Sequence, residues 1–272
     1  MKYKLIASDF DETFYSGETP FIPDENKRAV RKYIEAGGKF ILSTGRMFRS
    51  IRPFALELNL TGEIIAYQGA AVYDIDTSEL LMHIPIGVTD AAEILAYIES
   101  SGFHCQIYYN DIYYVSRENA YTEYYSKYCN IPVNVAHMPL NEYVLRHNIN
   151  PTKIMVVTDR DKLIGFYDKT VDKYYGRYGF ARSSNKFMEV TSPVANKGVG
   201  LKFLLERYGI NRSESLAVGD SLNDIPMIRY SGLGVAVGNA MDEVKAAADY
   251  ITVNSSENAI ARIIKMVMRD EL

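Results

Sequence analysis

Short apolar runs that end in polar side chains recur along the chain, and segments with helical periodicity follow them. Runs of this length, bounded by turn residues, are typical of buried strands, and their alternation with helices predicts βαβ units in a parallel sheet. The carboxyl ends of parallel strands meet at one edge of a sheet, so we expect Asp9, Thr44 and Asp220 to lie close together. The three runs are 4–8, 39–42 and 215–218.

The apolar spacing and the turn residues predict the remaining elements at both ends of the chain. Turn residues are expected over 12–20. In the first part we expect helices over 24–34 and 47–58, a strand over 63–66 and a hairpin over 71–74 and 80–84. In the last part we expect helices over 196–208, 224–230, 241–247 and 257–268, and strands over 233–237 and 250–253.

The segment 85–190 differs in composition and holds fourteen of the 22 tyrosines. Its patterns predict a separate, smaller α/β module. Paired tyrosines suit strands and half-buried faces, which is the interpretation we favour, and stacking of some of them on a ring of a substrate stays open. The expected helices are 90–99, 118–128 and 159–175, and the expected strands are 104–108, 112–116, 153–157, 181–184 and 187–190.

Composition narrows the class of protein. A net charge of −4 argues against broad binding to nucleic acid backbones, although a local basic pocket is compatible with it. Cys105 and Cys129 are too few and too scattered for a disulfide framework or a zinc site. The amino-terminal apolar stretch is too short for a signal peptide, and no run reaches membrane-spanning length. We therefore expect a cytoplasmic enzyme or binding protein without nucleic acid or membrane partners.

Asp9 and Asp11 are two acids separated by one residue at a strand end. Where the chain curls after a strand, both side chains can turn toward the same site. One carboxylate could then attack or bind a metal while the other handles a proton. In the alternative interpretation Asp9 caps a turn and Asp11 is solvated.

Three further groups offer oxygen or nitrogen ligands. Residues 219–224, Gly-Asp-Ser-Leu-Asn-Asp, supply hard oxygens that could hold Mg²⁺ together with Asp9, or form a loop in which Asp220 or Ser221 caps a helix. Thr44 and the amide of Gly45, expected at the start of a helix, could bind an anion. Lys197 could add a positive charge, although a lysine taken alone is typical of a solvated surface.

Four segments, taken in order, resemble the four motifs of the haloacid dehalogenase superfamily, and the match is strongest with its Cof-like phosphatases. Those proteins insert an α/β cap between the second and third motifs. The resemblance thus implies an α/β fold with a Rossmann-like core, a mainly parallel sheet and an inserted cap, with the core formed by 1–84 and 191–272 and the cap by 85–190. The segments are 9–13, 43–46, 196–198 and 219–224.

Two positions depart from the family pattern. Glu12 stands where the family usually has Gly, which places an extra acid near the first motif or alters the adjoining flap. The tail 254–259 lacks the usual Asp-Gly. Neither departure replaces a group that performs chemistry.

The resemblance implies a Mg²⁺-dependent phosphatase that hydrolyses small phosphorylated metabolites, sugar phosphates or similar monoesters, through an aspartyl-phosphate. The sequence does not decide between a monomer and a homodimer. Asp9 is the implied nucleophile, Asp11 protonates the leaving alcohol and later deprotonates water, and Asp9, the Asp11 carbonyl and Asp220 bind Mg²⁺. Two supporting roles follow: Asp224 orients Lys197 or a metal-bound water, and Arg46 braces its loop or meets the substrate. The implied phosphate ligands are Thr44, Gly45, Lys197 and Asn223.

Two alternatives stay open at this point. A phosphotransferase or phosphomutase would use the same intermediate with another acceptor, since fold and motifs do not decide the acceptor. A non-catalytic sensor of phosphorylated metabolites would bind without turnover. The presence of both Asp9 and Asp11 argues against a sensor, because binding alone needs no nucleophile.

Overall fold

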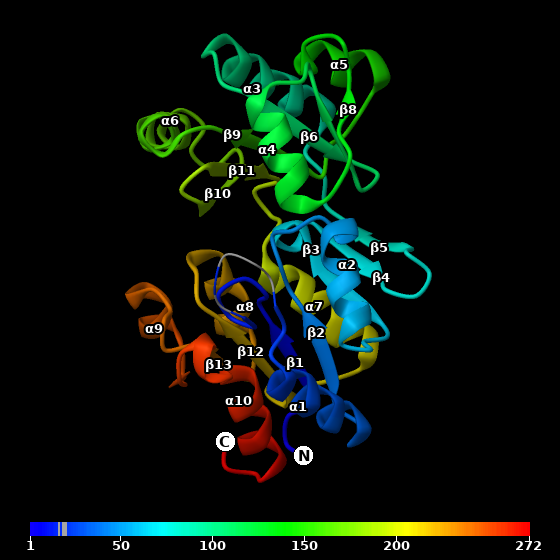
Figure 1. The fold of residues 1–272 in the computed structure, drawn as a ribbon, viewed down its shortest axis with the longest axis vertical. Coiled ribbons are helices and arrows are strands. Elements are labelled where there is room, and N and C mark those ends of the chain that lie inside the picture. Colours follow the sequence, from blue (N-terminus) through cyan, green and yellow to red (C-terminus); the bar gives the residue numbers. More distant parts are fainter. Residues whose placement is uncertain (16, 18–20) are drawn as a thin grey trace. The chain divides into compact units, whose positions relative to one another are not determined.

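A computed structural model describes residues 1–15, 17 and 21–272. The chain divides into two compact units, one formed by residues 1–82 and 196–272 and the other by residues 83–195 (Figure 1). We call the first the core unit and the second the insert unit.

The core unit is organised around a five-stranded parallel sheet in the order β14-β13-β12-β1-β2. Strand β1 lies inside this sheet, where Ala7 is in register with Ala217 on one side and Ile41 on the other. All four β1 residues are buried, as expected for a parallel strand covered on both faces. The strands are β1 (Leu5–Ser8), β2 (Lys39–Leu42), β12 (Ser215–Gly219), β13 (Leu233–Ala236) and β14 (Tyr250–Ile251).

Six α-helices lie in the described part of the core unit. The helix α7 is bounded by signals that the sequence carries: the Asn196 side chain accepts a hydrogen bond from the Val199 amide (3.1 Å), and Gly209 ends the helix at φ +63°. An apolar cluster joins α7 to the sheet, including Leu5, Ile41 and Leu201. The helices are α1 (Asp24–Glu35), α2 (Phe48–Glu57), α7 (Lys197–Tyr208), α8 (Ile225–Tyr230), α9 (Asp242–Ala247) and α10 (Ala259–Met268).

A smaller sheet in the order β3-β4-β5 follows α2, with β3 and β4 antiparallel. A single parallel bridge from Ser43 to Ile65 connects it to the end of β2. The expected strand and hairpin are therefore present. Their bounds are β3 (Glu63–Ala66), β4 (Ala71–Asp74) and β5 (Leu80–His83).

The insert unit has its own six-stranded sheet in the order β10-β11-β9-β6-β7-β8, antiparallel except for the pair β7-β8. Helices α3, α5 and α6 contribute to its apolar cluster. The strands are β6 (Cys105–Tyr109), β7 (Ile112–Val115), β8 (Asn134–Val135), β9 (Lys153–Val157), β10 (Gly179–Ser184) and β11 (Phe187–Thr191). The helices are α3 (Val88–Ser100), α4 (Ala120–Cys129), α5 (Leu140–His147) and α6 (Arg160–Lys173).

Several tyrosines of the insert unit belong to its interior. Tyr108, Tyr113 and Tyr125 are buried with ring centroids 5.4–6.4 Å apart, and the Tyr108 hydroxyl donates to that of Tyr125 (2.6 Å). The packing interpretation is confirmed for these three residues.

The expected α/β class, with a parallel core sheet and a second α/β region, is confirmed, with differences in detail. Helix α5 and the two-residue strand β8 were not predicted, and β14 stops at Ile251 rather than at residue 253. The expected turn over 12–20 includes residues 16 and 18–20, which lie outside the described residues. Among the described helices, none combines the length and apolar character needed to cross a membrane.

Candidate active site

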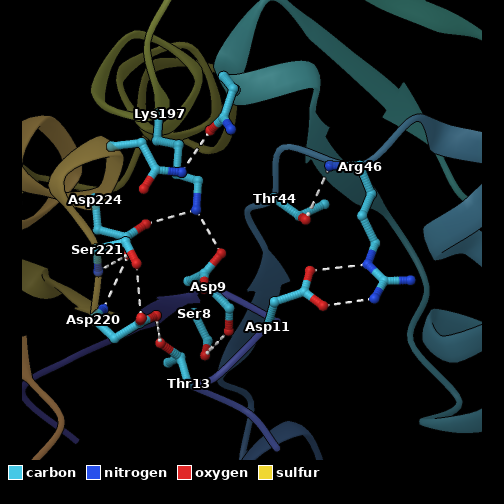
Figure 2. A network of polar contacts seen from close by, with 12 residues as sticks. Ser8, Asp9, Asp11, Thr13, Thr44, Arg46, Lys197, Asp220, Ser221 and Asp224 are labelled. Carbon is cyan, nitrogen blue, oxygen red and sulfur yellow. Dashed lines mark hydrogen bonds and ion pairs between the residues drawn. The ribbon is translucent and has the colours of Figure 1, made fainter. Parts of the chain in front are cut away.

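Asp9 follows β1 directly, at the carboxyl edge of the parallel sheet. Its amide donates to the Val218 carbonyl (2.9 Å), which extends the β1-β12 pairing by one residue. Its side chain is buried, and Oδ1 accepts a hydrogen bond from Lys197 Nζ at 2.5 Å (Figure 2). The Asp9 side chain is thus held in an interior ion pair, which differs from the alternative in which it only caps a turn.

Lys197 is the first residue of α7, and its side chain is 1% exposed. Besides Asp9, its Nζ donates to Asp224 Oδ1 (2.6 Å). The helix start comes close to neighbouring backbone at two glycines. A Cβ on Gly198 would lie 2.6 Å from the Pro226 carbonyl oxygen, and one on Gly69 would lie 2.0 Å from that of Asn196. The interpretation of Lys197 as a solvated surface lysine is therefore wrong.

Asp220 and Asp224 complete a buried group of carboxylates from the loop after β12. Asp224 Oδ2 accepts hydrogen bonds from the amides of Asp220 and Ser221 (both 3.0 Å). Hydroxyl groups of Thr13 and Ser221 donate to the two Asp220 oxygens (both 2.7 Å) (Figure 2). One oxygen from each of Asp9, Asp220 and Asp224 lies within 4.8 Å of the others.

The charges of this group do not balance, because three buried carboxylates face the single ammonium of Lys197. Burial raises the pKa of Asp9 well above its usual range; Lys197 acts to lower this pKa, and the carboxylates of Asp224 and Asp220 act to raise it. Burial and Asp224 likewise raise the pKa of Asp220. For Lys197 burial lowers the pKa, but Asp224 and Asp9 more than offset this and raise it. The raised pKa of Lys197 is therefore an effect of the negative charge around it.

Such a site fits a divalent cation. Carboxylate oxygens are the ligands that Mg²⁺ prefers, and a cation would compensate buried charge that is otherwise costly. The three carboxylates in the group are those of Asp9, Asp220 and Asp224. The expected role of the Asp11 backbone carbonyl as a metal ligand stays a prediction.

The Asp11 side chain pairs with Arg46. Arg46 Nε donates to Oδ2 (2.9 Å) and Nη2 donates to Oδ1 (2.5 Å), a two-pronged geometry that favours strong pairing (Figure 2). The Tyr15 hydroxyl also donates to Oδ1 (2.6 Å). Burial acts to raise the pKa of Asp11, but these donors, Arg46 foremost, outweigh it and lower the pKa. Arg46 therefore contacts the second acid of the first motif directly.

The expected phosphate ligands Thr44, Gly45 and Asn223 lie around a residue that the sequence analysis missed. Asn223 Nδ2 donates to Gln68 Oε1 (2.7 Å), and Gln68 Nε2 would be 2.2 Å from a Cβ on Gly45. Gln68 has φ +59°, and Tyr67 before it has φ +53°. Non-glycine residues rarely adopt this region, and such strain clusters at functional sites. In the sequence, the glycine that follows Gln68 is the local feature that could have indicated an unusual backbone conformation here.

Thr44 and Gly45 differ from expectation in one respect. They lie in the loop before α2, which begins at Phe48, and so they are not part of the first turn of that helix. The Thr44 hydroxyl accepts a hydrogen bond from the Arg46 amide (3.1 Å), which closes a local turn in place of a helix start.

Glu12 adopts φ +57°, which explains why a glycine suits this position. Its carboxylate accepts a hydrogen bond from the Gly17 amide (3.3 Å), and its carbonyl accepts one from Asn239 Nδ2 (2.9 Å). The Glu12 side chain thus contacts its own loop.

Comparisons with known proteins agree with this arrangement. Residues 6–264 match the family model of haloacid dehalogenase-like hydrolases. The chain is 30% identical over 275 residues to the Bacillus subtilis 5-amino-6-(5-phospho-D-ribitylamino)uracil phosphatase YcsE, covering 96% of this chain and 94% of that one. It is 27% identical to the phosphatase YwpJ of the same organism, covering 97% and 100%.

A solved structure shares the fold over nearly the whole chain. The crystal structure of a haloacid dehalogenase-like hydrolase from Bacteroides thetaiotaomicron has a TM-score of 0.84 at 27% identity, covering 97% of this chain and 99% of that one. Family model, named phosphatases and fold agree, and this chain belongs to the haloacid dehalogenase-like hydrolases as a Cof-like phosphatase.

Proposed function

We propose that the protein is a Mg²⁺-dependent phosphatase of the cytoplasm that hydrolyses small phosphorylated metabolites through an aspartyl-phosphate on Asp9. One observation carries the proposal. Asp9 is buried at the end of β1, is held by Lys197 at 2.5 Å, and belongs to a group of three carboxylates. This arrangement supports a nucleophile beside a positively charged side chain and a set of oxygen ligands for a metal ion.

In the first half of the proposed reaction, an Asp9 carboxylate oxygen attacks phosphorus while the bond from phosphorus to the leaving alcohol breaks. The alcohol oxygen takes a proton from Asp11. In the second half, a water oxygen attacks phosphorus, Asp11 takes the water proton, and the Asp9–phosphorus bond breaks. Inorganic phosphate leaves and both aspartates return to their starting states.

Positive charge and hydrogen-bond donors would hold the phosphate. Lys197, the Thr44 hydroxyl, the Gly45 amide and Asn223 are the proposed ligands, and Asp224 positions Lys197 through their 2.6 Å contact. Asp9, Asp220 and the Asp11 carbonyl would hold Mg²⁺, with Asp224 adjoining. The bound ion would offset the repulsion between carboxylate and phosphate.

The substrate class rests on the relatives. YcsE is named for an ester of phosphate with a ribityl chain, which makes phosphorylated sugars and sugar alcohols the first candidates. We assign the choice of leaving group to residues 85–190, the proposed cap, because the phosphate ligands all lie outside that segment.

The test is phosphate release from a panel of monoesters, measured with Mg²⁺ and with EDTA. The panel contains sugar phosphates, nucleotides, flavin and pyridoxal phosphates, and 5-amino-6-(5-phospho-D-ribitylamino)uracil. The parent is compared with Asp9→Asn and with Asp242→Asn, an exposed aspartate of α9 that serves as the matched control. We expect release that requires Mg²⁺, survives in Asp242→Asn and is lost in Asp9→Asn.

Other outcomes would redirect the assignment. Phosphate appearing mainly on a second sugar would support a phosphotransferase. Binding of phosphorylated metabolites without release would support a sensor. Equal turnover by Asp9→Asn and the parent would refute Asp9 as the nucleophile.

A further inference from the structure

A three-residue segment between β3 and β4, Tyr67–Gly69, contacts three of the four motif segments, all within the core unit. Its backbone is tied to the second motif. The Tyr67 amide donates to the Arg46 carbonyl (3.0 Å), and the next amide, that of Gln68, donates to the Thr44 carbonyl (3.0 Å). The loop that carries the expected phosphate ligand Thr44 therefore shares backbone hydrogen bonds with this segment.

The third motif lies against the same segment. Gly69 has φ +86°, and a Cβ on it would lie 2.0 Å from the Asn196 carbonyl oxygen and 2.8 Å from the Lys197 amide nitrogen. The two residues before this glycine also have positive φ, and both are buried. Such a backbone conformation persists where the surrounding structure holds it. The backbone from which the Gln68 side chain projects is thus fixed by contacts with two motifs.

The Gln68 side chain makes the contact with the fourth motif. Its Oε1 accepts a hydrogen bond from Nδ2 of Asn223 (2.7 Å), a half-buried residue of the short turn Leu222–Asp224. Within the described part of the chain, this is the one hydrogen bond of the Asn223 amide group. The last torsion of an asparagine is broad, so a partner at this distance decides the orientation of the amide plane. Nδ2 carries two hydrogens, and the second remains for another acceptor.

We propose that Gln68 is a positioning residue that holds the Asn223 amide group in the orientation in which its second N–H donates to the substrate phosphate. This inference rests on the proposed function, in which Asn223 is a phosphate ligand. Gln68 itself does not contact the substrate and acts only through Asn223. Hydrogen bonds weaken steeply when the donor points away from the acceptor, so a donor that is held in place binds phosphate more tightly than one that rotates.

The test measures the Kd of inorganic phosphate by isothermal titration calorimetry in the presence of Mg²⁺. Inorganic phosphate has no leaving group, so residues that select the leaving group do not enter the comparison. Four proteins form a double-mutant cycle: the parent, Gln68→Met, Asn223→Ala and the variant with both changes. Methionine is similar in size to glutamine, but its thioether is only a weak hydrogen-bond acceptor.

We expect each single change to raise the Kd of phosphate about tenfold. Adding Gln68→Met to Asn223→Ala should raise it further by less than about twofold, because the amide group that Gln68 positions is then absent. The value of kcat/KM for p-nitrophenyl phosphate should fall in the same pattern. Gln68→Gly is the second variant, since glycine adopts φ +59° freely and removes the side chain without straining the backbone.

Gln106→Met is the matched control, because it changes the only other glutamine of the chain. Gln106 is also buried, but it belongs to the insert unit, where its Nε2 donates to the Tyr108 hydroxyl (2.6 Å). This control is expected to leave the Kd of phosphate unchanged. Urea unfolding of each variant verifies that it is folded.

Each remaining outcome counts against a specific claim. If Gln68→Met raised the Kd equally in the parent and in Asn223→Ala, Gln68 would act independently of Asn223. An unchanged Kd in either single variant would remove that residue from phosphate binding. These results overturn this inference and leave the phosphatase intact. A parent protein that binds inorganic phosphate but releases none from p-nitrophenyl phosphate or the ester panel overturns the proposed hydrolysis, while the binding cycle still decides the role of Gln68.

Discussion

At the scale of single residues, Glu12 shows how a departure from a family pattern is accommodated. Its φ of +57° is a conformation that glycine adopts freely and β-branched residues adopt at a cost. The hydrogen bond from Gly17 keeps its carboxylate within its own loop. We therefore expect the substitution of Glu12 for glycine to affect the backbone conformation of this loop more than the chemistry of the site.

We therefore expect Glu12→Gly to keep kcat/KM within about twofold of the parent. Glu12→Val should lose about 1–2 kcal/mol of unfolding free energy, because its branched Cβ is strained at positive φ. Urea unfolding and phosphate release measure the two effects. A large loss of activity in Glu12→Gly would show that the carboxylate itself serves the reaction.

Lys197 supplies the second prediction at this scale, since it is the ammonium shared by Asp9 and Asp224. Lys197→Met keeps similar volume but leaves the carboxylates uncompensated, which should cost about 3 kcal/mol of unfolding free energy in EDTA. A bound cation replaces part of the missing charge, so the loss should be smaller with Mg²⁺.

The measurement is urea unfolding of parent and variant with Mg²⁺ and with EDTA. Lys202→Met, on the same helix but 56% exposed and 3.8 Å from Glu206, is the control and should change little. Identical losses by Lys197→Met under both conditions would argue that no cation binds these carboxylates.

At the scale of elements, the sequence patterns predicted a helix or strand correctly where the residues that begin and end it lie next to it in the sequence. Helix α7 has its cap at Asn196 and its end at Gly209, so its expected bounds over 196–208 nearly match the observed ones. Helix α5 was missed for a physical reason. Its first amides, Leu140 and Asn141, donate to the carboxylate of Glu99, which is distant in sequence. No local pattern can show a cap of that kind.

The start of α7 also predicts a sensitive position, Gly198. An added Cβ would lie 2.6 Å from the backbone oxygen of Pro226, so Gly198→Ala must displace the helix start that carries Lys197. We expect kcat/KM to fall about tenfold or more and unfolding free energy to fall by about 1–3 kcal/mol.

Gly165 offers the matched control, since it lies within α6 and a Cβ there meets nothing within 4 Å. Gly165→Ala should stabilise the protein by up to about 1 kcal/mol with unchanged activity. Steady-state kinetics and thermal unfolding test both. Full activity in Gly198→Ala would mean that the close approach does not position Lys197.

The insert unit carries a pH-dependent contribution to stability. Burial lowers the pKa of His104 from 6.5 to about 4, and its ring nitrogen Nδ1 lies 3.0 Å from Asn119 Nδ2. Between these two pKa values the unfolded chain binds a proton that the folded state does not bind. Stability therefore falls as pH drops from about 6.5 to 4, by at most about 3 kcal/mol.

His104→Gln should reduce this slope, measured by urea unfolding between pH 7 and pH 5.5. His147→Gln, which removes an exposed histidine from α5, is the control. A slope identical in the parent and His104→Gln would show that other groups cause the pH dependence.

At the scale of the whole molecule, the two units differ in how the chain builds them. The insert unit is one continuous segment with its own apolar cluster, and the core unit joins two separated segments. We expect residues 83–195, expressed alone, to unfold cooperatively and to give dispersed amide resonances. Residues 1–82 alone should not, because β1 lacks its β12 neighbour. Calorimetry measures whether each fragment unfolds cooperatively, and NMR measures the dispersion of its amide resonances. A disordered 83–195 fragment would contradict the expectation.

What the sequence could predict follows from the range of the interactions involved. Asp9, Thr44 and Asp220 were expected at one sheet edge from strand patterns alone, and the parallel order β12-β1-β2 agrees with that expectation. The contacts of Tyr15 with Asp11 and of Gln68 with Asn223 depend on side-chain directions and loop conformations. Such contacts leave no periodic trace in a sequence.

The position of β1 in the sheet has a consequence for synthesis on the ribosome. The chain emerges amino terminus first, so Asp9 and Asp11 leave the exit tunnel long before β12, the strand that covers one side of β1. Until then β1 presents an open hydrogen-bonding edge, which in a nascent chain invites wrong pairing. Lys197 and Asp220 arrive only after the whole insert. The proposed catalytic group is therefore among the last parts of the protein to assemble, and we expect a translation product that ends before Asp220 to release no phosphate.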